Sequence, residues 1–185
     1  LDCPGTGESG RSWVAPAMMH NAFLVRLALS RLGLGRVDVL GYSWGGLLAQ
    51  QLAIQHPWCV RRLVLACTTP GLGGLPAAPQ VSWRMLTPRR YYSPAYLTQI
   101  AASTYGGRFR REPDLVDAEV SRRMSHPPSL AGYFLQVLAA TTYSSLPGLR
   151  LISSRTLVLA GDDDPIIPTV NQRILARLIR RSTQR

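Results

Sequence analysis

The sequence predicts an α/β fold, in which parallel sheet strands are flanked by helices and interrupted by a helical insertion. Two observations predict it. Short apolar runs at 37–41, 63–67 and 156–160 each end in small or turn-forming residues, and segments with helical periodicity alternate with them. Continuous apolar strands of this length are typical of a parallel sheet covered on both faces. With 185 residues, the chain is long enough for one domain with a sizeable core, or for part of a larger one.

Three helices are expected around these strands. The first covers residues 18–32, where apolar side chains recur at intervals of three and four residues: Met18, Ala22, Val25, Leu29 and Leu32. Gly33 and Gly35 follow, where a helix C-terminus favours residues that can take a positive φ. Residues 45–55 and 170–179 predict the second and third helices. This alternation is the order of an α/β fold with right-handed crossovers.

The segment between the second and third strands differs in composition. It contains nine of the fourteen aromatic residues, and its helical patterning is patchy. Because open α/β sheets bind ligands at the carboxyl ends of their strands, we expect this segment to form a cap or lid there. The alternative is a small helical layer with its own core. The predicted organisation is a core part at 1–69, a helical cap at 70–151 and a second core part at 152–185.

Composition and charge exclude several classes of protein. The chain is 46% hydrophobic, too apolar for a disordered segment, yet no apolar run reaches the roughly 18 residues of a membrane-spanning helix. The formal net charge is +11, and all 21 basic residues are arginine, which favours anionic partners. Arginines cluster at 108–111 and 177–181, but no nucleic-acid-binding module accompanies them, so we expect no nucleic-acid partner.

The cysteines and the first residues bear on localisation. Cys3, Cys59 and Cys67 are odd in number and lack metal or redox spacing, so they predict reduced thiols in the core of a cytoplasmic protein. The first ten residues lack the basic and apolar regions of a secretion signal.

The strongest chemical signal is the stretch Gly-Tyr-Ser-Trp-Gly-Gly at 41–46, between a predicted strand and a predicted helix. A nucleophile on so sharp a turn needs strained backbone angles, and we expect Gly41 and Gly45 to remove side chains that would collide. The hydroxyl of Ser43 would then stand exposed above the sheet. The backbone N–H of Trp44 would point toward a developing oxyanion, with the helix polarity adding positive charge.

A second signal follows the third predicted strand, where three adjacent carboxylates precede a proline turn. We expect at least one of them to face water and one to have a fixed partner, because burying all three would be costly. In hydrolases whose nucleophilic serine lies on the turn between a strand and a helix, the acid that orients the general base lies in a loop of this kind. The spacing favours Asp164 over Asp162 and Asp163. A helix N-cap cluster or a metal site are the alternatives, and the spacing does not favour a metal.

The general base has no evident candidate in the sequence. An imidazole should follow the acid, yet the three histidines, His20, His56 and His126, all precede Asp164. His20 and His56 have the positions of surface or capping residues, and a mobile cap is a poor platform for His126. We therefore expect the base beyond Arg185, after a further strand.

Several blocks resemble the α/β-hydrolases and, more narrowly, the intracellular medium-chain-length poly(3-hydroxyalkanoate) depolymerases. The shared blocks are Gly41–Gln51, Leu63–Ala66, Pro88–Tyr91, Tyr105–Pro113 and Thr156–Pro165. The stretch at 1–9 also resembles the Asp-x-Pro-Gly-x-Gly-x-Ser sequence that follows an earlier strand in α/β-hydrolases. The early strands, the loop of the second oxyanion donor and the histidine of the family are missing, so residues 1–185 alone are expected to be inactive.

The resemblance implies serine-ester hydrolysis of a stored polyester in the cytoplasm, without a metal or organic cofactor. Ser43 would attack the ester carbonyl, Asp164 would orient the imidazole, and the Trp44 N–H would bind the oxyanion. An aromatic-rich cap suits aliphatic side chains, and a basic face would help docking on an anionic granule surface. The alternatives are another capped esterase or lipase, a meta-cleavage-product hydrolase, or an inactive fragment.

Overall fold

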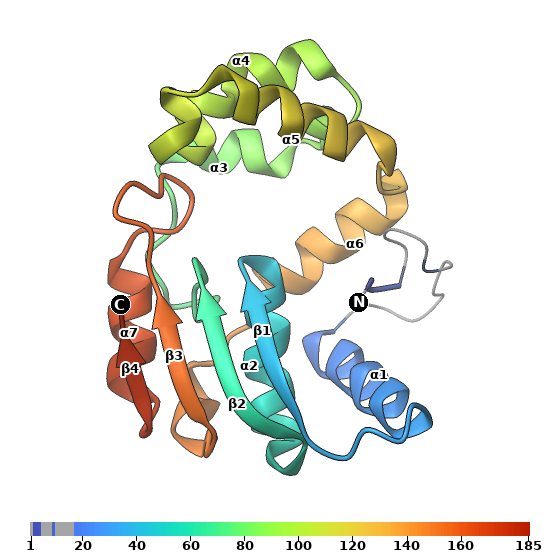
Figure 1. Ribbon diagram of the computed structural model, residues 1–185, viewed down its shortest axis with the longest axis vertical. Helices are drawn as coiled ribbons and strands as arrows, with labels where there is room; N and C mark the ends of the chain where they lie inside the picture. The colour runs from blue at the N-terminus through green and yellow to red at the C-terminus, as the bar shows by residue number, and fades with distance from the viewer. Residues whose placement is uncertain (1, 5–8, 10–16) are drawn as a thin grey trace. The chain divides into compact units, whose positions relative to one another are not determined.

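A computed structural model describes residues 2–4, 9 and 17–185, and it contains a four-stranded parallel sheet (Figure 1). The strands follow one another in the order β1 (Val37–Tyr42), β2 (Val60–Ala66), β3 (Arg155–Leu159) and β4 (Ser182–Gln184). The first three confirm the strands predicted from the apolar runs. The expectation that the next strand begins beyond Arg185 was wrong, because Ser182–Gln184 already pairs with β3.

The remaining elements are helical. They are α1 (Met18–Arg31), α2 (Trp44–Gln55), η1 (Pro57–Cys59), α3 (Pro79–Leu86), η2 (Pro88–Tyr91), α4 (Pro94–Tyr105), η3 (Gly107–Arg110), α5 (Pro113–Ser125), α6 (Leu130–Thr141), η4 (Leu146–Leu151) and α7 (Val170–Leu178). Three helices of the insertion begin at a proline, whose fixed φ suits the first helical position. None of the described helices has the length and apolar character needed to cross a membrane.

The chain divides into two compact units, which are described separately below. The helical unit comprises residues 1–15, 76–137 and 162–168, and the sheet unit comprises residues 16–75, 138–161 and 169–185. These limits differ from the predicted boundaries at 69/70 and 151/152. The end of α6 belongs to the sheet unit, while the loop after β3 belongs to the helical unit.

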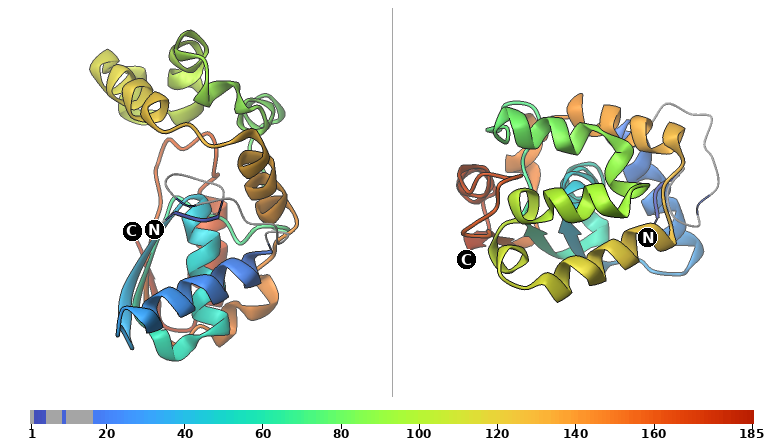
Figure 2. Two further views of the ribbon diagram at one scale, coloured as in Figure 1. Left: turned by 90° about the vertical axis from the view of Figure 1, so that its right-hand side faces the viewer. Right: turned by 90° about the horizontal axis from the view of Figure 1, so that it is seen from above.

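Within the sheet unit, helices cover one face of the sheet. Figure 2 shows α1 and α2 on the same side of the strands. Right-handed crossovers that always step in the same direction, as the order β1-β2-β3-β4 requires, place their helices on one side. Leu40 and Tyr42 on the other side are 69% and 65% exposed. The sheet covered on both faces, which the apolar runs predicted, is therefore not found among the described residues.

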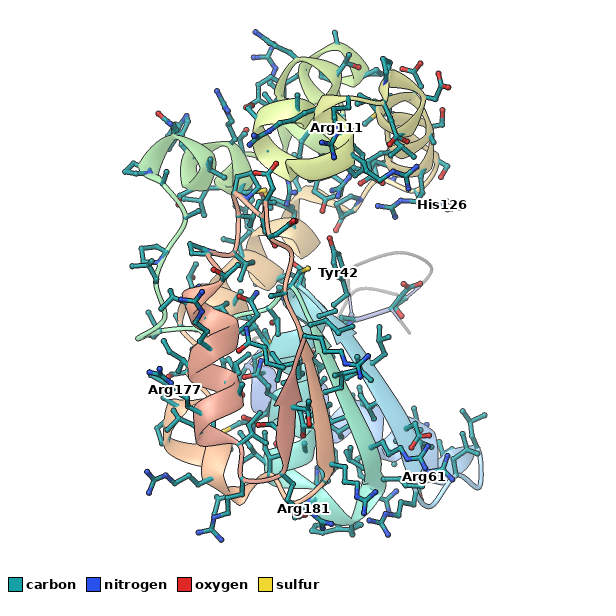
Figure 3. All side chains as sticks on the ribbon, turned by 60° about the vertical axis from the view of Figure 1, so that its left-hand side comes forward. Tyr42, Arg61, Arg111, His126, Arg177 and Arg181 are labelled. Carbon is teal, nitrogen blue, oxygen red and sulfur yellow. The ribbon has the colours of Figure 1, made fainter. Side chains whose placement is uncertain are left out.

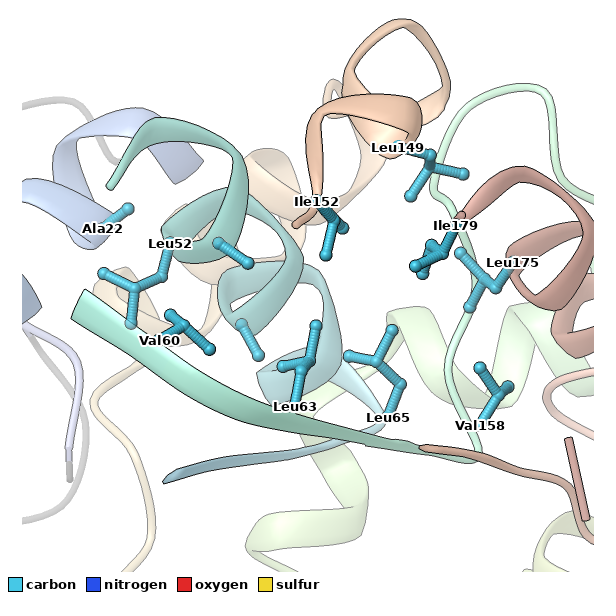
Figure 4. Packing of buried hydrophobic residues seen from close by; sticks show 12 residues of the cluster. Ala22, Leu52, Val60, Leu63, Leu65, Leu149, Ile152, Val158, Leu175 and Ile179 are labelled. Carbon is cyan, nitrogen blue, oxygen red and sulfur yellow. The ribbon is translucent and has the colours of Figure 1, made fainter. Parts of the chain in front are cut away.

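The core of the sheet unit lies between this covered face and the helices. Leu63, Leu65 and Val158 point from the strands toward Leu52 of α2 and Leu175 of α7 (Figure 4). All five of these side chains are at most 2% exposed. Their contacts fix α2 and α7 on the sheet, and α2 carries the turn described below.

The end of α1 follows the sequence prediction. Gly33 takes a φ of 70°, its N–H donates to Ser30 O, and Leu34 N donates to Leu29 O at 2.8 Å. This is the Schellman arrangement, which glycine favours because it has no Cβ. None of the three described cysteines forms a disulfide; Cys3 and Cys59 are buried and Cys67 is half-buried.

Candidate active site

A sharp turn joins β1 to α2 at Ser43. Ser43 has φ 51° and ψ −118°, a backbone conformation that a residue with a Cβ rarely adopts. Strain of this kind costs about 1–3 kcal/mol and persists only where the surrounding structure enforces it. Strand β1 ends at Tyr42 and helix α2 begins at Trp44, so the strand–turn–helix context predicted for the nucleophile is present.

Three hydrogen bonds hold the strained backbone of Ser43. Its N–H donates to Ala66 O at the end of β2, over 3.0 Å. Its carbonyl accepts from the N–H of Gly46, at 2.9 Å, and from the hydroxyl of Thr68, at 2.8 Å. The turn is therefore fixed both to its own helix and to the neighbouring strand. Thr68 was not singled out in the sequence, because its contact with Ser43 joins residues from different elements.

The glycines of the turn have unequal roles. A Cβ at Gly41 would lie 2.6 Å from Ala49 Cβ and 2.6 Å from Gly45 O, so this position requires glycine, as expected. A Cβ at Gly46 would lie 2.3 Å from Thr68 Oγ1. At Gly45, apart from the backbone of its own helix, a Cβ would meet no described atom within 4 Å. Among the described residues, the steric role expected for Gly45 is therefore not found, and Gly46 has such a role instead.

A buried glutamine links the first turn of α2 to the segments that follow β2. Gln50 is 0% exposed, and its amide group donates to Gly46 O at 2.9 Å and to Thr69 O at 3.1 Å. Its carbonyl oxygen accepts from the hydroxyl of Ser145 at 2.7 Å. Every strong hydrogen-bonding group of this buried side chain is thereby used, which is what burial of a polar group requires. These hydrogen bonds connect the first turn of α2, next to Ser43, to Thr69 and Ser145.

The register of the sheet brings several strand ends to one edge. Tyr42 pairs with Ala66, and Ala66 pairs with Leu159. The chain therefore leaves the sheet at residues 43, 67 and 160 along the carboxyl edge, where open α/β sheets bind ligands. Trp44 is the first residue of α2, so its N–H belongs to the helix N-terminus, which favours negative charge.

The three adjacent carboxylates after β3 have different surroundings. Asp162 and Asp163 are exposed, whereas Asp164 is half-buried. One carboxylate oxygen of Asp164 accepts from the N–H groups of Ile166 and Ile167, each at 2.9 Å. Asp163 is bound by residues of the helical unit. As expected, one carboxylate faces water while others have fixed partners. Ser43 belongs to the sheet unit and Asp164 to the helical unit.

The histidines occupy three different environments. His20 lies in the first turn of α1, and His56 follows the last residue of α2. His56 is the C-cap residue of α2, and its backbone N–H donates to Leu52 O at 2.8 Å, as the expected capping position requires. Its ring packs edge-on against Trp58, and both ring nitrogens are buried without a hydrogen-bond partner among the described residues. Burial and the nearby charge of Arg26 lower the pKa of His56. His126 follows α5 on the outside of the helical unit, with Nδ1 3.0 Å from Ser125 Oγ (Figure 3).

Two further candidates concern metals and the N-terminal stretch. Within residues 2–4, 9 and 17–185, no group of three His, Cys, Asp or Glu side chains could hold a metal ion. Half of the Asp-x-Pro-Gly-x-Gly-x-Ser resemblance at 2–9, residues 5–8, lies outside the described residues. In its described part, the Ser9 hydroxyl donates to Asp2 O at 3.0 Å.

The fold and the turn at Ser43 define the class of protein. The sequence matches the alpha/beta hydrolase fold family over residues 1–185, and the chain belongs to this family. Among curated proteins it is 42% identical, over 95% of its length, to a poly(3-hydroxyalkanoate) depolymerase of Ectopseudomonas oleovorans. It is 28% identical, over 82% of its length, to a 2-hydroxymuconate semialdehyde hydrolase of Pseudomonas putida. The chain spans 62% and 54% of these two proteins.

Solved structures agree with this fold. A hydrolase from Pseudomonas aeruginosa superimposes with a TM-score of 0.80 at 22% identity, covering 100% of this chain and 68% of that one. A thermophilic esterase from Thermogutta terrifontis superimposes with a TM-score of 0.77 at 25% identity, covering 99% and 68%. The α/β-hydrolase resemblance and fold class inferred from the sequence are thereby confirmed.

Proposed function

We propose that the protein is a serine-type ester hydrolase that depolymerises poly(3-hydroxyalkanoate). The observation that carries the proposal is the strained Ser43 at the carboxyl edge of the sheet, where β3 also leads into the acidic loop. The 42% identity to a protein named as a depolymerase of this polyester supports the choice of substrate.

In the proposed reaction, the hydroxyl oxygen of Ser43 attacks an ester carbonyl carbon while its proton passes to an imidazole. The Trp44 N–H stabilises the tetrahedral oxyanion. The bond from the former carbonyl carbon to the ester oxygen of the next polymer unit then breaks, that oxygen takes the proton from the imidazolium and leaves as a hydroxyl group, and Ser43 remains acylated. Water attacks the acyl-serine by the same route and releases a 3-hydroxy acid or oligomer.

Asp164 is proposed to orient this imidazole, and the base itself is proposed to be a histidine outside residues 1–185. One oxygen of Asp164 is engaged by two backbone N–H groups, which leaves the second oxygen to accept from an imidazole N–H. Among the three histidines of the sequence, His56 has both ring nitrogens buried and packs on Trp58, and His126 contacts Ser125. We expect residues 1–185 alone to show negligible turnover for this reason.

Apolar side chains exposed on the helical unit support a lipophilic substrate. Trp83 is 74% exposed, Leu130 is 55% exposed and Phe134 is 53% exposed. Leu130 and Phe134 lie about one turn apart on α6, so they present neighbouring apolar side chains to solvent. We propose that these helices act as a cap and contact the aliphatic side chains of the polymer, for which each buried CH₂ contributes about 0.8 kcal/mol.

The net charge suggests where the protein meets its substrate. At +11, the chain is attracted to anionic surfaces, and Arg177 and Arg181 project outward from the sheet unit (Figure 3). We propose a cytoplasmic protein that docks on the anionic surface of storage granules. Co-sedimentation with granules that weakens as salt is raised would support this, and salt-independent binding would contradict the electrostatic part.

The test compares three substrates with the full-length protein: medium-chain polyester granules, soluble p-nitrophenyl esters and a meta-cleavage product. We expect 3-hydroxy acids or their oligomers from the granules, and a loss of about 10³-fold or more in Ser43→Ala. Hydrolysis of soluble esters alone would reject the depolymerase and retain an esterase. Activity on the meta-cleavage product alone would favour the function named for the 28%-identical relative.

A further inference from the structure

The block Tyr105–Pro113 contains two adjacent glycines whose role the proposed reaction does not explain. Helix α4 ends at Tyr105, and Gly106 and Gly107 take φ values of 65° and 50°. A Cβ at Gly106 would lie 2.1 Å from the backbone oxygen of Asp163 and 3.0 Å from Pro165 Cδ. The acidic loop therefore packs directly on the backbone of Gly106, which only glycine permits.

Both carboxylate oxygens of Asp163 bind the same segment. The N–H of Gly107 donates to Oδ2 at 2.7 Å, and the guanidinium of Arg110 lies 3.2 Å from Oδ1. Arg110 also donates through Nε to Ala102 O in α4, at 3.2 Å. Asp163 thus connects the acidic loop to α4 and to the 3₁₀ turn that follows it, and all of these residues belong to the helical unit.

The neighbouring carboxylates have separate partners. Asp164 accepts from Ile166 and Ile167 within the loop, while Asp163 accepts from the segment 106–110. A carboxylate that accepts a backbone N–H makes a strong, charge-assisted hydrogen bond. The exposed pair with Arg110 contributes less, because its side chains are about half exposed to solvent. The Gly107 hydrogen bond is exposed as well, so the tether consists of both contacts of the Asp163 carboxylate together with the close packing of its backbone on Gly106.

We propose that Asp163 is a positioning residue, which holds the acidic loop on the segment 106–110 and thereby sets the place of Asp164. This inference rests on the proposed role of Asp164 as the acid that orients the imidazole. A displacement of about 1 Å at a reacting group costs about 10²-fold in rate. Loss of the contacts of Asp163, the residue next to Asp164, is therefore expected to reduce activity strongly.

The test compares Asp163→Ala with Asp162→Ala in the full-length protein. Asp162 is exposed, and its side chain makes no hydrogen bond or ion pair with the residues that the structure describes. Both variants remove one negative charge from the same loop. We expect kcat to fall about 10–100-fold in Asp163→Ala with KM changed less than about 3-fold, and Asp162→Ala to stay within about 2-fold of the parent. Equal effects in the two variants would overturn the inference.

The pH profile separates positioning from a general loss of stability. A displaced Asp164 stabilises the imidazolium less, so the acidic limb of kcat/KM should move to lower pH in Asp163→Ala beyond any shift in Asp162→Ala. A variant that is only less stable would melt at a lower temperature and keep the parent profile at temperatures where it is folded. That outcome would overturn the inference.

Hydrogen exchange gives a readout that does not depend on activity. In Asp163→Ala, amides of 162–168 and of 104–111 should exchange faster together, while Asp162→Ala should leave both segments as in the parent. Unchanged exchange in 104–111 would contradict the tether. Asp164→Asn tests the underlying proposal separately: if it keeps full activity, the role of Asp164 fails, whereas an inactive Asp164→Asn with a fully active Asp163→Ala refutes only the inference.

Discussion

The hydroxyl of Thr68 donates a hydrogen bond to the backbone carbonyl of Ser43, with 2.8 Å between the two oxygens. The same threonine side chain occupies the space above Gly46 that a Cβ there would fill. Thr68 is 0% exposed. One buried side chain beyond the end of β2 therefore fixes the strained turn in two ways, by a hydrogen bond and by packing.

Replacement of Thr68 by valine tests the hydrogen bond, because valine keeps the shape and lacks the hydroxyl. We expect the free energy of unfolding to fall by about 1 kcal/mol, as for loss of a single hydrogen bond. Because the turn positions Ser43, kcat on a soluble ester should fall about 10-fold with little change in KM. The control is Thr68→Ser, which keeps the hydroxyl. A valine variant with parent kcat would show that this hydrogen bond does not position the nucleophile.

The glycines at 41 and 45 offer a matched pair of substitutions. Gly41→Ala should reduce the free energy of unfolding by about 1–3 kcal/mol, since its Cβ would overlap Ala49 and Gly45. Gly45→Ala should be neutral, or should stabilise by up to about 1 kcal/mol, because alanine favours the helix and the position has room. Urea denaturation measures both. The reverse order of stabilities would contradict the packing described for the turn.

The ring of His56, whose two nitrogens are buried, predicts a pH-dependent stability. Burial and then the charge of Arg26 lower the pKa of His56 in the folded state, so the unfolded chain binds the proton more readily. The stability contributed by the neutral ring is present above the ordinary pKa of 6.5 and is lost as the pH falls through the lowered pKa.

Urea midpoints between pH 7.5 and pH 5 measure this effect. The parent should lose more stability over this range than His56→Phe, which keeps a ring against Trp58 and cannot titrate. His20→Phe serves as the control for removing a histidine elsewhere in the same unit. Parallel pH dependences in the parent and His56→Phe would contradict the assignment.

Local patterns were sufficient to predict the main elements of the sheet unit and the turn at Ser43. The apolar runs identified β1, β2 and β3, and the spacing of glycines around Ser43 identified a strand–turn–helix junction. Strand β4 was missed because Ser182–Gln184 is polar and has no apolar run to signal it.

Contacts between distant parts of the chain could not be predicted. The need for glycine at 46 depends on Thr68, which lies on another element, and local spacing pointed to Gly45 instead. Likewise, nothing in the three adjacent aspartates indicates that Asp163 binds Gly107 and Arg110. Such roles arise from packing between elements that are distant in the sequence. A local sequence motif carries no information about this packing.

The nucleophilic role of Ser43 is tested most directly by covalent labelling of the full-length protein with a fluorophosphonate. Trypsin cleaves after Arg36 and Arg61, and Ser43 is the sole serine between them. We expect one adduct per active site, located on the 37–61 peptide, formed in step with loss of ester hydrolysis and absent in Ser43→Ala. An adduct on another peptide with equal loss of activity, or full activity in Ser43→Ala, would contradict the account.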